Sequence, residues 1–178
     1  MSSATERKKT ARVPLSGVIA FDPEICTGCG SCELVCSIAH GVESNPSLSR
    51  ITIYYNPLEA DAVHDVCQQC HYPSCLYACP VEAILIHGES GARYIDDDKC
   101  TGCGLCYKAC PFTPERAMIK VREEGGEDKY YKCDLCKDQQ DGPQCVQICP
   151  TEALILVQAK SRKKRKKTII NNRNRNGF

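Results

Sequence analysis

Sixteen cysteines in four groups of four constrain this chain more than any other feature. No cysteine falls outside a group, so the pattern is an internal repeat of one structural unit. Cysteine makes up about nine per cent of the 178 residues, far above ordinary usage. The groups, one to four, are Cys26, Cys29, Cys32 and Cys36; Cys67, Cys70, Cys75 and Cys79; Cys100, Cys103, Cys106 and Cys110; and Cys133, Cys136, Cys145 and Cys149.

The spacing within the groups indicates iron rather than zinc. Groups one and three read C-x2-C-x2-C-x3-C, so three thiolates surround one small object. A tetrahedral zinc site normally takes C-x2-C from each of two separated loops. The run with a fourth cysteine before proline is instead the bacterial [4Fe–4S] pattern, whose last cysteine ligates the other cluster of a pair. Groups two and four are lengthened versions, so the sequence predicts four clusters, with structural zinc sites as the alternative.

Disulfides require an oxidising compartment, and the sequence shows no route to one. The stretch MSSATERKKTARVPLSG is polar and basic, with neither an apolar segment nor a twin-arginine pair. No apolar run approaches the ~20 residues that span a bilayer; the longest resemble ALILV at 153–157. We therefore expect a cytoplasmic protein without a transmembrane segment. Export in the folded state, on a partner's signal, is the open alternative.

Proline and short apolar runs punctuate the groups. CPVEAILI (79–86), CPFTPERAMI (110–119) and CPTEALIL (149–156) each place proline after the last cysteine and a β-prone run after that. Apolar stretches also precede groups one and three. This predicts a repeated strand, cysteine loop, short helix and strand. Residues 37–66 form an insert with a further strand at SRITIYY, and Ser37 replaces the expected proline after Cys36.

The charge is unevenly distributed. Residues 160–178 hold nine of the 23 Lys and Arg and none of the 22 Asp and Glu, so the remaining 159 residues carry a net formal charge of −8. Two interpretations of this tail stay open: a disordered extension, or an arm that docks on an acidic surface of a partner or of a second copy. The acidic body argues against a nucleic-acid partner, and an anionic membrane surface is a further open alternative for the tail.

No residue outside the cysteine groups indicates substrate chemistry. The sequence has no Walker loop, flavin motif or nucleophile with a nearby base, and His40, His64 and His87 belong to no recognisable constellation. A cluster acting as a Lewis acid would need a missing ligand, but sixteen cysteines supply all four ligands to four clusters. We therefore predict no enzymatic activity in this chain and no catalytic residues.

At residues 15–157 the chain resembles the dimethyl sulfoxide reductase iron–sulfur subunit family. CQQCHYPSCLYACP and CDLCKDQQDGPQCVQICP are similar to the family's second and fourth motifs. FDPEICTGCGSCELVCSIAHGVESNPSLSRI is most similar to the electron-transfer partners of tungsten aldehyde oxidoreductases. The resemblance implies an α+β fold: two pseudo-symmetric bacterial-ferredoxin-like modules, each for two [4Fe–4S] clusters, with short strands and helices and a basic C-terminal tail.

The resemblance also implies domain limits and ligand sets. Residues 1–14 are an N-terminal extension, 15–57 with 127–159 an outer module (groups one and four), 58–126 an inner module (groups two and three), and 160–178 the tail. Sequential pairing of groups three and four stays open, because their gap is also short. The implied sets are Cys26, Cys29, Cys32 with Cys149 (site 1); Cys67, Cys70, Cys75 with Cys110 (site 2); Cys100, Cys103, Cys106 with Cys79 (site 3); and Cys133, Cys136, Cys145 with Cys36 (site 4).

Together these features imply a subunit that relays electrons between a catalytic oxidoreductase subunit and a redox donor or acceptor. The expected partner carries a tungsten or molybdenum pterin and oxidises aldehydes; a flavin subunit or a ferredoxin is a further partner, and self-association through the tail is another contact. The alternatives are a subunit of a hydrogenase or carbon monoxide dehydrogenase, or a free-standing polyferredoxin.

Overall fold

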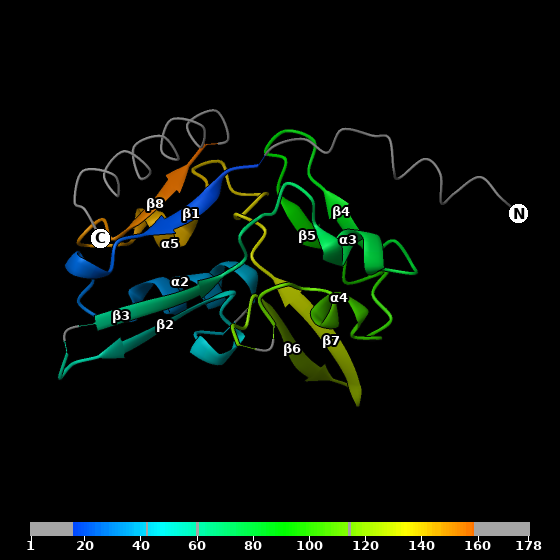
Figure 1. Ribbon diagram of the computed structural model, residues 1–178, viewed down its shortest axis with the longest axis horizontal. Coiled ribbons are helices and arrows are strands. Elements are labelled where there is room, and N and C mark those ends of the chain that lie inside the picture. The colour runs from blue at the N-terminus through cyan, green and yellow to red at the C-terminus, as the bar shows by residue number, and fades with distance from the viewer. Residues whose placement is uncertain (1–15, 42, 60, 114, 159–178) are drawn as a thin grey trace, which may run out of the picture.

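The structure is a computed structural model that describes residues 16–41, 43–59, 61–113 and 115–158. Its elements are short and alternate along the chain (Figure 1). The strands are β1 (Val18–Phe21), β2 (Ile51–Asn56), β3 (Asp61–Val66), β4 (Ile84–Ile86), β5 (Arg93–Ile95), β6 (Ile119–Glu124), β7 (Glu127–Lys132) and β8 (Leu154–Val157). The helices are η1 (Pro23–Ile25), α2 (Ser31–His40), η2 (Pro46–Leu48), α3 (Ser74–Ala78), α4 (Leu105–Lys108) and α5 (Gln144–Gln147), of which η1 and η2 are 3₁₀ turns.

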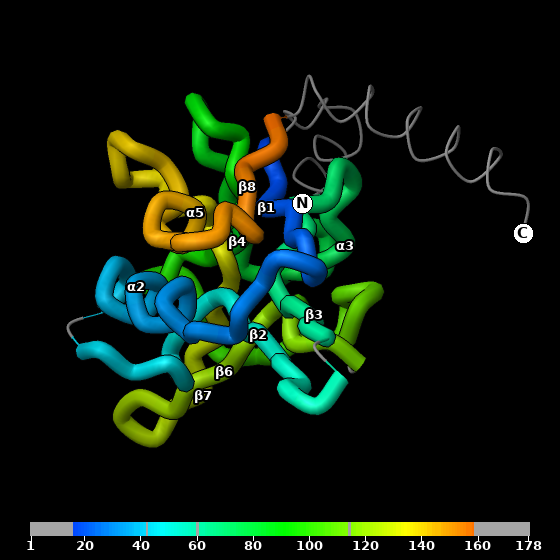
Figure 2. Tube along the Cα trace, turned by 90° about the vertical axis from the view of Figure 1, so that its left-hand side faces the viewer, coloured from blue at the N-terminus to red at the C-terminus, as the bar shows by residue number. Residues whose placement is uncertain are grey.

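The strands form four antiparallel pairs, and one pair joins the two ends of the described chain. β1 pairs with β8, with Val18 opposite Val157 and Phe21 opposite Leu154. β4 pairs with β5, with Ile84 opposite Ile95. Helix α2 packs against α5 near the first pair, and α3 packs against α4 near the second (Figures 1 and 2). Groups one and four therefore share one half of the molecule, and groups two and three share the other.

Two longer hairpins complete the fold. β2 pairs with β3, and β6 pairs with β7, each over six residue pairs. The sequence predicts β2 at SRITIYY and the strand that begins the second hairpin, but not their partners β3 and β7. Both partners are polar (DAVHDV and EDKYYK), because one face of a hairpin can remain in solvent. In Figure 1 the β2–β3 hairpin extends to the lower left and the β6–β7 hairpin to the lower right.

Proline limits three of the four cysteine-bearing helices. α3, α4 and α5 have four or five residues, and a Cys-Pro pair follows each of them. α2 has ten residues and continues to His40, because Ser37 stands where the other groups have proline. The Ser37 hydroxyl donates a hydrogen bond to the Leu34 carbonyl at 2.8 Å, inside the helix. This difference places His40 one turn beyond Cys36.

Polar side chains fasten the two halves together. Arg116 Nε donates to Asp65 Oδ1 at 2.7 Å, and Lys120 Nζ donates to the Ser49 carbonyl at 2.6 Å. Tyr131 Oη donates to the Ser47 carbonyl at 3.1 Å. Since Asp65 is 3% exposed, its pairing compensates for burial of the carboxylate. These contacts connect β3 and the segment from η2 to the start of β2 with β6, β7 and the residues just before β6.

One predicted boundary between the inner and the outer module falls at the tip of a hairpin. The boundary between residues 126 and 127 separates β6 from β7, which pair with each other along their whole length. The basic tail 160–178 and the extension 1–14 lie outside the described residues. Among the described helices, none combines the length and the apolar character needed to cross a bilayer.

Candidate metal centres

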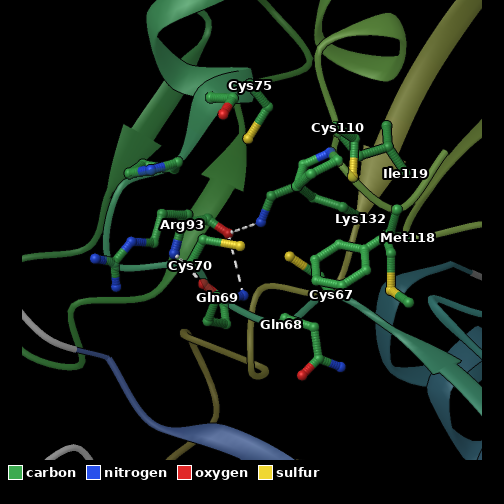
Figure 3. A pocket seen from close by; sticks show the side chains of 14 residues that line it. Cys67, Gln68, Gln69, Cys70, Cys75, Arg93, Cys110, Met118, Ile119 and Lys132 are labelled. Carbon is green, nitrogen blue, oxygen red and sulfur yellow. Dashed lines mark hydrogen bonds between the residues drawn. The ribbon is translucent and has the colours of Figure 1, made fainter.

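Two cavities in the structure are each lined by four cysteines. Cys26, Cys29, Cys32 and Cys149, the members of site 1, line one of them together with Phe21, Ile53 and Leu154. Cys67, Cys70, Cys75 and Cys110, the members of site 2, line the other together with Met118, Ile119 and Lys132 (Figure 3). In both, three thiols come from one cysteine group and the fourth comes from the other group of the same half.

The remaining eight cysteines also gather, as their mutual electrostatic influence shows. Burial raises the pKa of Cys106 to about 11, and the neighbouring thiols of Cys100, Cys103 and Cys79 contribute. Burial likewise raises the pKa of Cys145, with Cys36 and Cys136 as neighbours. Cys133 is affected in the same direction by burial and by Cys145. The structure therefore places Cys79 near the thiols of group three, and Cys36 near Cys145 of group four.

The four cysteine loops share one backbone conformation. The second residue after the first cysteine has a positive φ in every loop: Gly28 (65°), Gln69 (46°), Gly102 (69°) and Leu135 (61°). Glycine adopts this region freely, whereas Gln69 and Leu135 adopt it at a cost of order 1 kcal/mol. Because the same turn forms with different residues, it is set by the requirement that the following backbone and thiols curl around a common centre.

The hairpins cover the two glycine-containing loops. A Cβ on Gly28 would lie 2.5 Å from the Tyr55 ring of β2. A Cβ on Gly102 would lie 2.3 Å from the Asp128 carbonyl of β7. No side chain fits in either gap, so glycine is required there by close approach as well as by φ. Thus β2–β3 covers the loop of site 1, and β6–β7 covers the loop of site 3.

Backbone amides donate to several of the sulfurs. The N–H of Arg50 lies 3.2 Å from Cys36 Sγ, and the N–H of Ala83 lies 3.2 Å from Cys79 Sγ. Amide hydrogen bonds to ligand sulfur are one of the means by which a protein tunes an iron–sulfur cluster. The donor set in each half consists of thiols with amide support and contains no carboxylate among the cavity-lining residues. Such a set fits a thiolate-ligated iron–sulfur cluster, which would supply one-electron redox chemistry.

Buried thiolates are unfavourable without a compensating positive charge, and bound iron would supply that charge. Burial raises the pKa of Cys32 to about 12 and that of Cys75 to about 11. Iron ligation requires thiolates, so loading releases protons and supplies the positive charge that compensates for them. The charge of Lys132 opposes the effect of burial at Cys75.

His40 takes part in a constellation that the sequence did not reveal, so the prediction that it belongs to none is wrong. Its Nε2 lies 2.9 Å from Asp134 Oδ1, and its Nδ1 lies 3.8 Å from Cys36 Sγ. Burial opposes protonation, but hydrogen bonds to Asp134, Cys136 and Cys36 raise the pKa of His40 well above its ordinary value. Arg50 Nη1 completes the group, 2.8 Å from Asp134 Oδ2. The only sequence signal was Ser37, because a longer α2 brings its last residue to the loop of group four.

Known proteins agree with this chemistry. Residues 58–159 match the family described as "4Fe-4S dicluster domain", and residues 23–41 match one described as "4Fe-4S binding domain". "Electron transport protein HydN" of Escherichia coli (strain K12) is 30% identical, over 85% of this chain and 97% of that protein. "Formate dehydrogenase iron-sulfur subunit" of Haemophilus influenzae (strain ATCC 51907 / DSM 11121 / KW20 / Rd) is 31% identical, over 75% of this chain and 49% of that protein.

Two further similarities are partial. "NADH-dependent phenylglyoxylate dehydrogenase subunit beta" of Aromatoleum evansii is 39% identical over 76% of this chain, but the chain spans only 29% of that protein. A solved chain of "Active site complex BamBC of Benzoyl Coenzyme A reductase as isolated" is 28% identical, covers 79% of this chain and 76% of that one, and has a TM-score of 0.46, too low to support a conclusion about fold. The sixteen cysteines fit multiple [4Fe–4S] clusters, and the chain belongs to the 4Fe-4S ferredoxin-type family of electron-transport proteins and iron–sulfur subunits.

Proposed function

We propose that this chain is an electron-transfer subunit that holds four [4Fe–4S] clusters and relays electrons through them. The observation that carries the proposal is the gathering of four thiols at each of four places. Sites 1 and 2 are cavities lined by their four cysteines, and the thiols of sites 3 and 4 influence one another. We propose the ligand sets of sites 1 to 4 as they were defined above.

Electrostatic effects between cysteines of neighbouring sites support a single ordered path. Cys145 of site 4 is influenced by Cys32 of site 1, and Cys133 of site 4 by Cys67 of site 2. Cys75 of site 2 is influenced by Cys106 of site 3. On this basis we propose the order site 1, site 4, site 2, site 3 along the path. Each transfer moves one electron, so the donor at one end is oxidised as the acceptor at the other is reduced.

The ends of this path are also its most exposed points. Cys29 of site 1 and Cys103 of site 3 are the exposed cysteines among the described residues. Both follow a glycine at positive φ, Gly28 and Gly102. Electrons would enter and leave at these two loops, because tunnelling requires close approach of a partner.

The strand pairing supports two pseudo-symmetric modules. β1–β8 with α2 and α5 surrounds sites 1 and 4, and β4–β5 with α3 and α4 surrounds sites 2 and 3. The limits of the outer and inner modules are predictions from the sequence. The extension and the tail lie outside the described residues, so self-association through residues 160–178 stays a prediction from the sequence. A cytoplasmic location is likewise a prediction from the sequence.

For the partner, we propose a catalytic oxidoreductase subunit with a tungsten or molybdenum pterin, an aldehyde oxidoreductase. Support for tungsten and for aldehydes comes from the sequence resemblance at residues 21–51 alone. Relatives named as a formate dehydrogenase subunit and a phenylglyoxylate dehydrogenase subunit support a partner that oxidises a small carbonyl compound or acid. A hydrogenase, a carbon monoxide dehydrogenase and a chain without a permanent partner are the alternatives.

Elemental analysis of the complex that co-purifies anaerobically with this chain tests both parts of the proposal. Four clusters predict about sixteen irons and about sixteen acid-labile sulfides per copy. Tungsten or molybdenum alongside them would support the pterin partner. Nickel would point to a hydrogenase or carbon monoxide dehydrogenase, and iron on a lone polypeptide would exclude a permanent partner. About eight irons would contradict four clusters.

A further inference from the structure

A buried lysine points into the cavity of site 2. Lys132 is the last residue of β7 and is 2% exposed. Figure 3 shows its amino group among the sulfurs of Cys67, Cys70, Cys75 and Cys110. The Nζ donates to the Arg93 carbonyl and, at 3.2 Å, to the Cys133 carbonyl. Within the described chain its hydrogen-bond partners are thus backbone carbonyls rather than a carboxylate.

A buried ammonium needs more compensation than two carbonyls provide. The only other groups that it faces in the cavity with a tendency to negative charge are the four thiols. Burial raises the pKa of Cys70 and of Cys75, and the charge of Lys132 opposes that effect at both thiols. Four thiolates with a [4Fe–4S] core carry about two negative charges when oxidised and about three when reduced. Lys132 therefore stabilises the reduced form more than the oxidised form.

The other cavity provides an internal comparison. No lysine or arginine lines the cavity of site 1. At site 4, His40 and Arg50 both pair with the carboxylate of Asp134, at 2.9 Å and 2.8 Å, so two cations share one negative charge there. Arg93, which is 1% exposed, also lines the cavity of site 2. Of the two cavities, that of site 2 therefore has buried lysine and arginine side chains in its lining, and that of site 1 has neither.

Gln69 holds the lysine's two partners in place. Its Nε2 donates to the Cys133 carbonyl at 2.7 Å and to the Arg93 carbonyl at 3.4 Å, and its Oε1 accepts from the Arg93 N–H at 2.7 Å. Gln69 is fully buried and has a φ of 46°. The side-chain amide of Gln69 thus bonds to the backbone of Arg93 and Cys133, whose carbonyls accept from Lys132. Gln69 is therefore a positioning residue for Lys132.

We propose that Lys132 raises the reduction potential of the site 2 cluster above that of site 1, so that a single electron on the chain resides in its interior. This inference rests on the proposed function, since it assumes that site 2 holds a cluster. An electron at site 2 is shielded by Met118 and Ile119 and has one further station on the side of site 3. The chain would then retain an electron after its donor leaves.

The test is a potentiometric titration of the full chain followed by electron paramagnetic resonance. Lys132→Met should make reduction of one cluster at least tenfold less favourable, a shift of about 59 mV to lower potential for a one-electron couple. Cys75→Ser identifies the site 2 signal by altering it. Lys132→Arg keeps the charge and should hold the potential near that of the wild type.

The matched control is Lys108→Met. Lys108 lies two residues from Cys110 of the same site, but its side chain is exposed and solvent screens its charge. A shift in Lys132→Met that Lys108→Met and Lys132→Arg do not reproduce supports the proposal. Equal shifts in the Met and Arg variants, or no shift in any signal, would overturn it.

Iron content separates this proposal from the cluster assignment. About sixteen irons with unchanged potentials would reject the role of Lys132 and leave the four clusters in place. Fewer irons in the wild type would reject the four clusters themselves. If Lys132→Met fails to load site 2, Lys132→Gln decides, because it retains a donor to the carbonyls and removes only the charge.

Discussion

His40 Nε2 and Asp134 Oδ1 lie 2.9 Å apart although 94 positions separate the two residues in the chain. The contact joins the end of α2 to the loop of group four. Asp134 also forms an ion pair with Arg50, so one buried carboxylate pairs with two cations from the region of group one. Although burial acts against ionisation, the hydrogen bond from His40 and the charge of Arg50 hold the pKa of Asp134 well below its ordinary value.

Replacement of Asp134 should therefore loosen the half that holds sites 1 and 4. Asp134→Asn removes the charge and leaves two buried cations without it, a change that costs about 3–5 kcal/mol. The urea midpoint, measured anaerobically by loss of cluster absorbance, should fall. Asp138→Asn is the matched control from the same loop: its side chain is 73% exposed, so less than about 1 kcal/mol is expected. Equal decreases of the urea midpoint in the two variants would show that the buried ion pairs of Asp134 contribute no more to stability than an exposed one.

A comparison of Gly102 with Gly30 separates the effect of close approach from the effect of backbone strain. Gly102 (φ 69°) would place a Cβ 2.3 Å from the Asp128 carbonyl, whereas Gly30 (φ 72°) has nothing within 4 Å. Gly102→Ala should displace the site 3 loop and reduce the iron content from about sixteen to about twelve per chain. Gly30→Ala should cost only the conformational strain, about 1–2 kcal/mol, and keep its iron. The same loss in both variants would show that φ alone matters.

Cys149 decides which groups share a cluster. With the proposed ligand sets, Cys149→Ser should alter the same paramagnetic signal as Cys29→Ser, because both residues line one cavity. Cys110→Ser should alter a different signal, that of site 2. If Cys149→Ser instead changes the signal affected by Cys103→Ser, groups three and four pair sequentially and the proposed order of sites fails.

His64 should make stability depend on pH just below neutrality. Burial, and secondarily the charge of Arg116, lower the pKa of His64 in the folded chain, with Asp65 acting in the opposite direction. The unfolded chain, with a pKa of about 6.5, then binds more protons, so stability falls as the pH drops below that value and levels off below the folded pKa. Between pH 7.5 and 5.5 the anaerobic thermal midpoint should decrease less in His64→Gln than in the wild type. A steeper decrease in the variant would contradict the shift.

The sequence by itself determined the local chemistry. The cysteine spacing fixed the loops, and the Cys-Pro pairs fixed short helices followed by the strands β4, β6 and β8. These features depend on neighbours along the chain, namely the reach of three thiols around one centre and the missing N–H and fixed φ of proline.

The tertiary structure decided which distant groups meet. Pairing of β1 with β8 brings Cys149 to the loop of Cys26, and no local pattern encodes that contact. The polar segments β3 and β7 form strands because each pairs with the preceding strand of its hairpin. His40 and Lys132 read as ordinary polar residues in the sequence. Their burial beside cysteines arises from packing between elements far apart in the chain, where the free energy of a charge depends on surroundings that spacing cannot specify.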